Sequence, residues 1–237
     1  MPTTERGSRA AARSRVKAPP VKKSIQREQT DIQSPEKVAS KRDLSLGRIL
    51  EAAVHLFATR GYWNSTLEEV AGVAGFTKGA VYYHFKSKEH LLLKVLETIE
   101  ARSIDATVNG VRLRGGSPTQ QLETFVKFQT QWAATHPEDL AVMIFMSVEV
   151  SRAKSKIRAQ MFRIYRKLTG QLETIIDAGK STGEFSTKQA TKDIVLYLEA
   201  VHDGNMLLWY RSGNDPEIGR KLTRATLSGF AHAVQGS

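Results

Sequence analysis

Residues 66–88 read TLEEVAGVAGFTKGAVYYHFKSK, and this stretch decides the fold of the chain. Thr66 predicts the start of a helix with a capping box, because Glu69 follows three residues later and can return its hydrogen bond. Gly75 ends that helix and permits a tight turn. Thr77 can then cap a second short helix. Two short helices separated by a glycine-centred turn form a helix-turn-helix unit.

The chain on both sides of this unit continues the helical pattern. Apolar residues recur every three or four positions from Leu44 to Phe57, and Gly61 marks the end of that helix. After the unit, Ser87 can cap a fourth helix that runs through Ile99. Five further helices are expected at about 117–135, 137–148, 153–182, 186–211 and 215–234, and a Ser186–Gln189 capping box opens the fourth of these five. No segment has the pattern of a strand, so the prediction is an all-α protein of about nine helices.

The second helix of the unit has a composition that is unusual for a core element. Small residues near its start would let it enter the major groove of DNA. Hydroxyl, imidazole and ammonium groups could then reach phosphates and base edges. These residues are Lys78, Gly79, Ala80, Tyr82, Tyr83 and His84. The alternative is that Tyr82 and Tyr83 pack against the protein and leave only their hydroxyls in water.

The run GFTKGAVYYHFKSKEHLL (75–92), with AAVHLFATRGYWNSTLEEVA (52–71) upstream, resembles the first four helices of the TetR family of transcriptional regulators. The resemblance implies a DNA-binding protein in which Thr77, Lys78, Gly79 and Ala80 lie in or against the groove. Tyr82, Tyr83 and His84 would face phosphates or base edges, Lys88 would contact phosphate, and Thr66 would cap the second helix at the DNA backbone. Val81 and Phe85 would belong to the core. Ala80 stands where a hydroxyl residue is common, which leaves operator preference open.

The resemblance also implies a helix-turn-helix domain at 43–90 and a ligand-binding and dimerisation domain at 91–237. Small residues on the last two expected helices fit a homodimer contact there. The expected function is that of a repressor that binds a palindromic operator and is released by a small, largely apolar effector. Its pocket is expected among aromatic, thioether and polar residues, each of which could instead belong to the core: Phe128, Trp132, Met143, Met146, Phe162, Tyr165, His202, Asn205, Met206 and Trp209. For His202, a hydrogen-bonded buried histidine is favoured over a metal ligand.

Basic residues are concentrated in two places of a chain whose net charge is +11. Residues 1–43 hold 11 Lys/Arg and 5 Asp/Glu, and residues 1–42 are predicted to form a disordered arm that either follows DNA phosphates or is simply solvated. Seven Lys/Arg and no acid occur at 151–170, with Arg152, Lys156, Arg163 and Lys167 on one helical face. That face is either an ordinary solvated surface or a docking strip for an anionic effector such as a fatty acyl thioester of coenzyme A.

Other classes of protein find little support in the sequence. It has no zinc-protease, Walker, GxSxG or dinucleotide motif, its six histidines are scattered, and it has no cysteine. We therefore expect neither an enzyme nor a bound metal or cofactor. The absence of an apolar run near 18 residues argues against a membrane span, and a cytoplasmic protein is the simplest interpretation. A general architectural DNA binder, held by its basic arm, is the remaining alternative.

Overall fold

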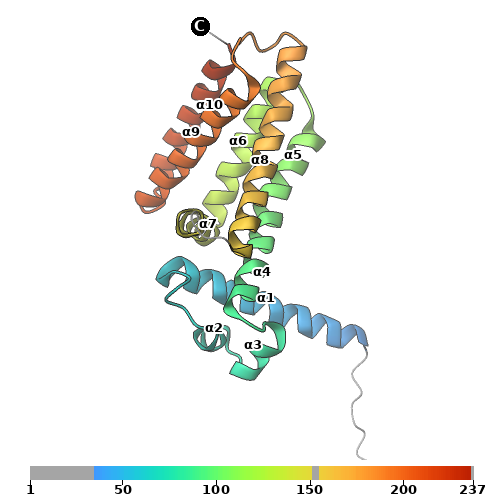
Figure 1. Ribbon diagram of the computed structural model, residues 1–237, viewed down its shortest axis with the longest axis vertical. Helices are drawn as coiled ribbons and strands as arrows, with labels where there is room; N and C mark the ends of the chain where they lie inside the picture. The colour runs from blue at the N-terminus through green and yellow to red at the C-terminus, as the bar shows by residue number, and fades with distance from the viewer. Residues whose placement is uncertain (1–34, 151–154, 236–237) are drawn as a thin grey trace, which may run out of the picture.

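The computed structural model describes residues 35–150 and 155–235, and side chains from Arg42 onward. Within this part the chain is entirely helical (Figure 1). The elements are α1 (Pro35–Arg60), α2 (Leu67–Ala74), α3 (Lys78–His84), α4 (Lys88–Glu100), the π-helical η1 (Ala101–Asp105), α5 (Ala106–Arg114), α6 (Pro118–Thr135), α7 (Pro137–Glu149), α8 (Lys156–Ser181), α9 (Thr191–Arg211) and α10 (Pro216–Gln235). Because α4, η1 and α5 follow one another without a break, the described residues form nine continuous helical runs, as predicted.

Most of the predicted helix starts are present, with the expected side chains as caps. Thr66 and Glu69 form a reciprocal capping box at α2. The Thr77 hydroxyl accepts from the amide of Ala80 at α3, and Ser87 caps α4 in the same way. Asp215 accepts from two amides of the first turn of α10. Each cap satisfies an amide that the helix itself cannot bond.

Two predicted boundaries are wrong. Helix α1 begins at Pro35, so the last eight residues of the expected arm, 35–42, are helical; the rest of that arm lies outside the described residues. Helix α9 begins at Thr191 and not at Ser186. The Ser186 hydroxyl bonds the carbonyl of Gln235 instead, and the amide of Thr187 bonds the carbonyl of Val234. This segment is therefore fixed against the end of α10 rather than wound into α9.

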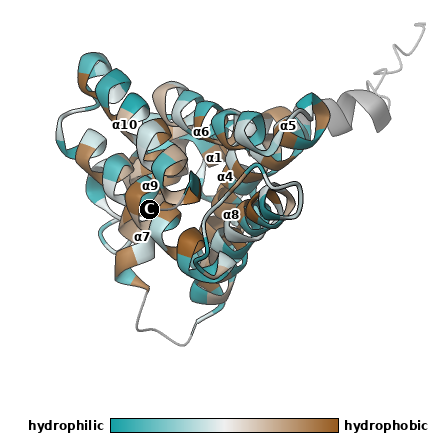
Figure 2. Cartoon of the chain, turned by 90° about the horizontal axis from the view of Figure 1, so that it is seen from above, coloured by the Kyte–Doolittle hydropathy of each residue, from teal (hydrophilic) through white to brown (hydrophobic). Residues whose placement is uncertain are grey.

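Helices α1 to α3 lie at one end of the molecule, and α4 rises from them into the larger bundle (Figure 1). Their common core is formed by buried apolar residues that include Ile49, Phe57, Val70 and Val81. In the bundle, α6 and α8 pack side by side, and α9 pairs with α10 on one flank. Seen from above, hydrophilic residues follow the outward side of α10 (Figure 2).

Polar contacts surround the place where α1 of the small domain meets α7 of the bundle. Arg102 of η1 pairs with the buried Asp139 of α7 at 3.0 Å. Burial raises the pKa of Asp139, and Arg102 opposes that rise. His55 of α1 lies 2.8 Å from Glu138 at the start of α7. No helix of the described part is both long enough and apolar enough to cross a membrane.

Candidate nucleic-acid interface and ligand cavities

Helix α3 presents one face to the core and the other to solvent. Val81 and Phe85 are buried, as predicted. Tyr83 is 73% exposed and Tyr82 42% exposed, so their rings are not packed away inside the domain. Gly79 is also exposed, and a Cβ there would approach only the Thr77 hydroxyl, at 3.9 Å. The outward face of α3 therefore has no side chain at Gly79, near its N-terminus, and carries two tyrosine hydroxyls farther along.

Glu68 of α2 holds two groups of this outward face. Its Oε1 lies 2.5 Å from the Lys78 ammonium and accepts a 3.3 Å hydrogen bond from the Tyr82 hydroxyl. The bond to Lys78 is the main reason that the pKa of Glu68 is below its usual value. Lys78 also stands 5.5 Å from the centre of the Tyr82 ring. A phosphate that binds Lys78 must compete with this carboxylate.

The opposite end of α3 is joined to α1. The His84 imidazole lies 3.3 Å from the Ser45 hydroxyl, and burial followed by the nearby Arg42 lowers the pKa of His84. Arg42 stands 5.8 Å from the centre of the Tyr83 ring. Arg42, expected to belong to the arm, thus stands over the exposed face of α3. Residues 35–42 have no apolar spacing from which this contact could be predicted.

Lys88 is placed differently from the expected phosphate contact. Its ammonium donates to the carbonyls of Tyr62, Trp63 and Ser65 at 2.8, 3.3 and 2.9 Å. An ammonium has three N–H donors, so all are used. The Tyr62 ring adds a cation–π contact at 4.5 Å. Burial lowers the pKa of Lys88. In this structure Lys88 therefore holds the loop between α1 and α2.

Arg48 is a further residue of this site and is not among the residues predicted from the sequence. Its guanidinium donates to the carbonyl of Ala74 at 2.8 Å and lies 4.8 Å from the centre of the Phe76 ring. It thereby satisfies a carbonyl at the end of α2, beside Gly75, whose φ of +71° makes the turn. A helix that ends at a glycine turn leaves its last carbonyls without a partner in the helix. That lack of a partner is the one signal in the sequence that could have indicated a donor such as Arg48.

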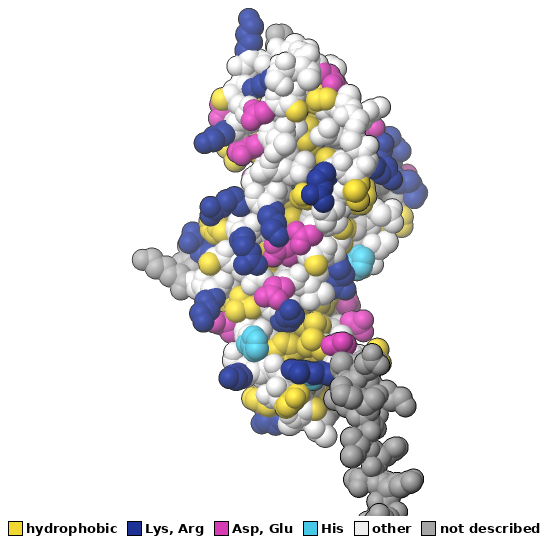
Figure 3. Space-filling view, turned by 90° about the vertical axis from the view of Figure 1, so that its right-hand side faces the viewer, with side chains coloured by type: hydrophobic (Ala, Val, Ile, Leu, Met, Phe, Trp, Pro, Cys, Tyr) yellow, Lys and Arg dark blue, Asp and Glu magenta, His cyan; other side chains and the backbone are white. Residues whose placement is uncertain are grey.

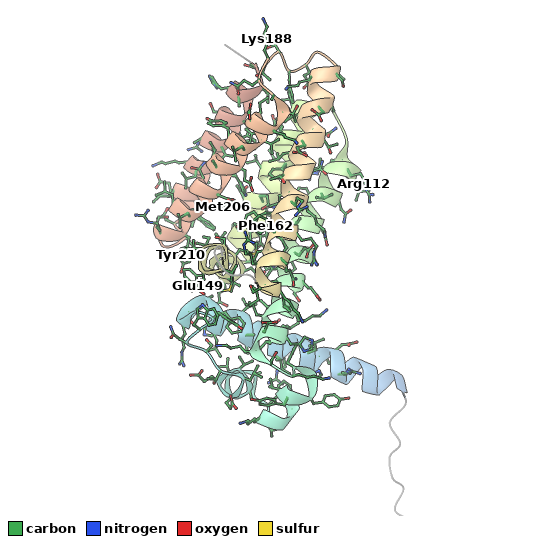
Figure 4. The ribbon with its side chains drawn as sticks, viewed as in Figure 1. Arg112, Glu149, Phe162, Lys188, Met206 and Tyr210 are labelled. Carbon is green, nitrogen blue, oxygen red and sulfur yellow. The ribbon has the colours of Figure 1, made fainter. Side chains whose placement is uncertain are left out.

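The larger domain contains two neighbouring cavities. The inner cavity, of about 230 Å³, lies among η1, α6, α7, α8 and α9. The outer cavity, of about 640 Å³, lies among α6, α9 and α10. His202 and Met206 line both, so they form a common wall. Figure 4 labels Met206 on α9, near the end of the bundle where α7 lies.

The predicted pocket residues divide between these spaces and the core. Trp132, Met143 and Tyr165 line the inner cavity, and Asn205 and Trp209 line the outer one. Phe162, labelled in Figure 4, is half-exposed and lines a separate hollow of about 320 Å³ with Tyr165.

Two predicted pocket residues lie elsewhere. Met146 is buried in the hydrophobic core. Phe128 packs on Gly110 of α5, where a Cβ would come within 2.3 Å of its ring. Only a glycine leaves room for that ring, so Phe128 closes the contact between α5 and α6.

His202 is the buried polar residue of the common wall. Its side chain is only 7% exposed, and its ring makes an edge contact with Phe125 at 6.1 Å. No hydrogen bond joins the imidazole to another described residue, contrary to the hydrogen bond expected for it. Burial lowers the pKa of His202 to about 4, so the ring is neutral near pH 7. Among the described residues, no group of His, Asp and Glu could hold a metal ion.

The comparisons with known proteins agree with this architecture. Residues 49–95 match the model described as "Bacterial regulatory proteins, tetR family", and residues 115–230 match "Tetracyclin repressor-like, C-terminal domain". The HTH-type transcriptional repressor NicS of Pseudomonas putida is 30% identical over 150 residues, covering 62% of this chain and 68% of NicS. The chain belongs to the TetR family. Membership makes it a DNA-binding transcriptional regulator and not an enzyme.

Solved structures of TetR-family regulators share the fold. The MbdR regulator from Azoarcus sp. CIB is 29% identical, with a TM-score of 0.70 over 81% of this chain and 98% of that one. FadR from Bacillus subtilis, solved in complex with stearoyl-CoA, is 19% identical, with a TM-score of 0.67 over 80% of this chain and 98% of that one. The all-α architecture predicted from the sequence is thus confirmed.

Two residues of the basic face of α8, Arg163 and Lys167, are paired with acids in this TetR-family protein. Arg163 lies 3.0 Å from Glu100 of α4, and Lys167 contacts Glu100 and, at 2.9 Å, Asp105. Burial alone would raise the pKa of Glu100, but Lys167 and Arg163 bring it below its usual value. Arg152 lies outside the described residues. Figure 3 likewise shows basic side chains standing among acidic ones on one flank of the molecule. Arg163 and Lys167 are exposed to solvent, as expected of an ordinary solvated face, but their pairing with acids means that they do not form a free docking strip.

Proposed function

We propose that this protein is a repressor that binds a palindromic operator as a homodimer and leaves it when a small, largely apolar effector enters the inner cavity. One observation carries the proposal: Ser103 and Ile104 of η1 line that cavity, and η1 continues α4, whose first turn adjoins the recognition helix. An effector in the inner cavity would thus press on the helical run that positions α3. The repressor names of relatives such as NicS support the direction of regulation.

On the DNA side, the exposed face of α3 would enter the major groove. Lys78, Gly79 and Tyr83 are exposed there, and Thr66 and Thr77 present helix ends suited to phosphate. Ala80 and His84 are partly exposed beside them. A dimer would place two such faces about one helical turn of DNA apart, or a multiple of that spacing.

The dimer contact is proposed for α9 and α10. Helix α9 carries exposed apolar side chains that a monomer leaves in water, among them Leu196 at 66% and Leu208 at 49%. Such a surface is typical of an association site. Tyr197 lies against α10 near Gly229, where a Cβ would approach its hydroxyl at 3.9 Å. Because Gly229 has no side chain, α9 and α10 can approach each other closely at this point.

The size of the inner cavity favours a small effector. A space of about 230 Å³ lies below the usual range for drug-sized ligands, and most of its wall is apolar. Gln129 bonds the Thr107 hydroxyl at 2.7 Å within the same region, so part of its polar lining is already satisfied. The pairing of Arg163 and Lys167 removes the support for an acyl-CoA headgroup along α8.

Binding to DNA is the first part of the proposal to test. Duplexes selected from a random library should contain a palindrome, and fluorescence anisotropy then gives the affinity of each variant at matched salt. Lys78→Ala and Tyr82→Ala should weaken binding. Glu68→Gln should strengthen it several-fold, because it frees Lys78 and removes a negative charge near phosphate. Lys86→Ala is the control for loss of one exposed charge beside α3. Equal affinities in Lys78→Ala, Tyr82→Ala and the parent would contradict the assignment of α3.

Release by an effector is the second part. Native mass spectrometry of the purified protein should find a small apolar molecule, and adding that molecule should lower DNA affinity. A hundredfold loss needs about 2.7 kcal/mol of coupling between the two sites. Ile144→Phe fills the inner cavity from its half-buried wall and should abolish the response while sparing DNA binding. A normal response in Ile144→Phe would place the effector elsewhere.

A further inference from the structure

The outer cavity has the size and composition of a ligand site in its own right. Its volume of about 640 Å³ is in the usual range for small-molecule pockets. Met206, Trp209 and Leu222 supply apolar walls, and Trp209 is held in place by a 2.8 Å bond from its indole N–H to the carbonyl of Asp215. The walls are therefore apolar and one of them, Trp209, is fixed in place, which favours binding of a hydrophobic body.

Two arginines of α10 stand in the lining of this cavity. Arg220 and Arg224 are four residues apart, so both lie on the same side of the helix. Neither guanidinium forms an ion pair or hydrogen bond with another described residue. Asp215 interacts with Arg220 only through its charge, which helps to lower the pKa of Asp215 after the hydrogen bonds from the amides of Ile218 and Glu217. Lys221, between them, is paired with Glu217 at 2.8 Å. Two guanidinium groups whose N–H donors are free at an apolar cavity favour an anion, because Arg binds carboxylates through paired N–H donors.

The α9 wall of the same cavity offers a neutral polar group. The buried His202 imidazole faces the cavity without a hydrogen bond to any described residue, so one ring nitrogen can donate and the other accept. A buried polar group without a partner is costly, and a polar atom of a ligand would relieve that cost.

Both arginines are accessible in the protomer, because Arg220 and Arg224 are exposed. Gly229, which adjoins Tyr197 of α9, follows Arg220 by nine residues. At 100° per residue, nine residues correspond to half a turn beyond two full turns. Arg220 therefore lies on the side of α10 opposite to this contact with Tyr197.

We propose that the outer cavity binds a carboxylate-bearing amphiphile, with Arg220 and Arg224 on the carboxylate and the apolar body against Met206, Trp209 and Leu222. The site goes beyond the proposed function, because it is separate from the inner cavity and requires neither DNA nor a dimer. A neutral molecule of the same shape would lack the charge-assisted hydrogen bonds and bind more weakly.

The test uses isothermal titration calorimetry of the full chain with 1-naphthaleneacetate and with its neutral counterpart 1-naphthaleneacetamide. The carboxylate should bind at least about ten-fold more tightly than the amide. Arg220→Gln/Arg224→Gln should remove this preference, whereas Lys221→Gln, a loss of charge on the same helix outside the cavity, should keep it. Ala134→Trp, which fills the exposed α6 edge of the cavity, should abolish binding of both molecules.

Equal binding of the two molecules, or an unchanged preference in the double arginine variant, would overturn the inference. Thermal unfolding of each variant shows that lost binding is not lost structure. DNA anisotropy, measured on the same samples, separates this result from the proposed function: a protein that binds the selected palindrome but shows no carboxylate preference refutes the site alone.

Discussion

Lys88 contributes to the stability of the DNA-reading domain through the three carbonyls that it holds. In Lys88→Ala these charge-assisted hydrogen bonds are lost, and we expect the free energy of unfolding to fall by about 1–3 kcal/mol. Urea unfolding measures this change, and DNA affinity should fall with it. Lys86→Ala, two residues away and exposed, should leave stability unchanged. Normal stability with weakened DNA binding in Lys88→Ala would restore the phosphate contact expected from the sequence.

His202 makes stability depend on pH in mildly acidic solution. The folded protein keeps the imidazole neutral down to about pH 4, whereas the unfolded chain binds a proton near pH 6.5. Because the unfolded state then holds more protons, stability is lost as pH falls from about 6.5 to 4. A pKa difference of this size corresponds to about 3 kcal/mol. Urea unfolding between pH 7 and 4.5 should show a steeper decline for the parent than for His202→Gln. Parallel declines would contradict this role.

At the scale of single elements, α8 ends against the segment that leads to α9. Gly179 faces the buried Phe185 ring, and a Cβ there would lie 2.1 Å from it. Gly179→Ala should therefore lower the free energy of unfolding by about 1–3 kcal/mol through overpacking. Gly170→Ala is the matched control, since it lies in the same helix with nothing within 4 Å of the added Cβ. It should stabilise by up to about 1 kcal/mol, and equal effects of the two changes would refute the contact.

The same segment shows what local sequence can and cannot predict. Thr66, Thr77 and Ser87 were predictable as caps because their partners lie within three residues. Ser186 and Gln189 have the same spacing but form no cap, because Phe185 is drawn under α8 and the backbone of Thr187 bonds α10. Those partners are distant in the chain. Local spacing therefore located helices well and failed where tertiary contacts fixed the backbone.

The functional residues likewise divide into those that local sequence predicts and those that depend on tertiary contacts. The outward face of α3 could be predicted from residue types, since Val81 and Phe85 fall on the opposite side of one short helix. The role of Lys88 could not, because an ammonium suits loop carbonyls as well as phosphates. The acids that pair with α8 lie more than 60 residues away, so its basic face looked free in the sequence.

At the scale of the whole molecule, the residues before α1 add positive charge to a DNA-binding protein. Residues 1–34 hold 8 Lys/Arg and 3 Asp/Glu. Removing them should preserve the fold and the choice of operator, while the dependence of log Kd on log salt becomes shallower if these cations displace counterions. Anisotropy titrations at several salt concentrations measure the slope. Identical slopes for the full and shortened chains would exclude phosphate contacts by this segment.

The π-helical turn η1 has a consequence for how the length of the chain can vary. A π turn contains about one more residue than an α turn. The turn at η1 therefore holds one extra residue, while the side chains of α4 and α5 keep the directions they would have in one continuous α-helix. Shortening Ala101–Asp105 by one residue would tighten the turn to α-helical winding and leave both flanks in their present phase. The same deletion within α4 would instead rotate every later side chain by about 100° and break the register between Glu100 and α8. The π turn is thus the place along this 27-residue run where the chain can lose a residue without misaligning the helices on either side.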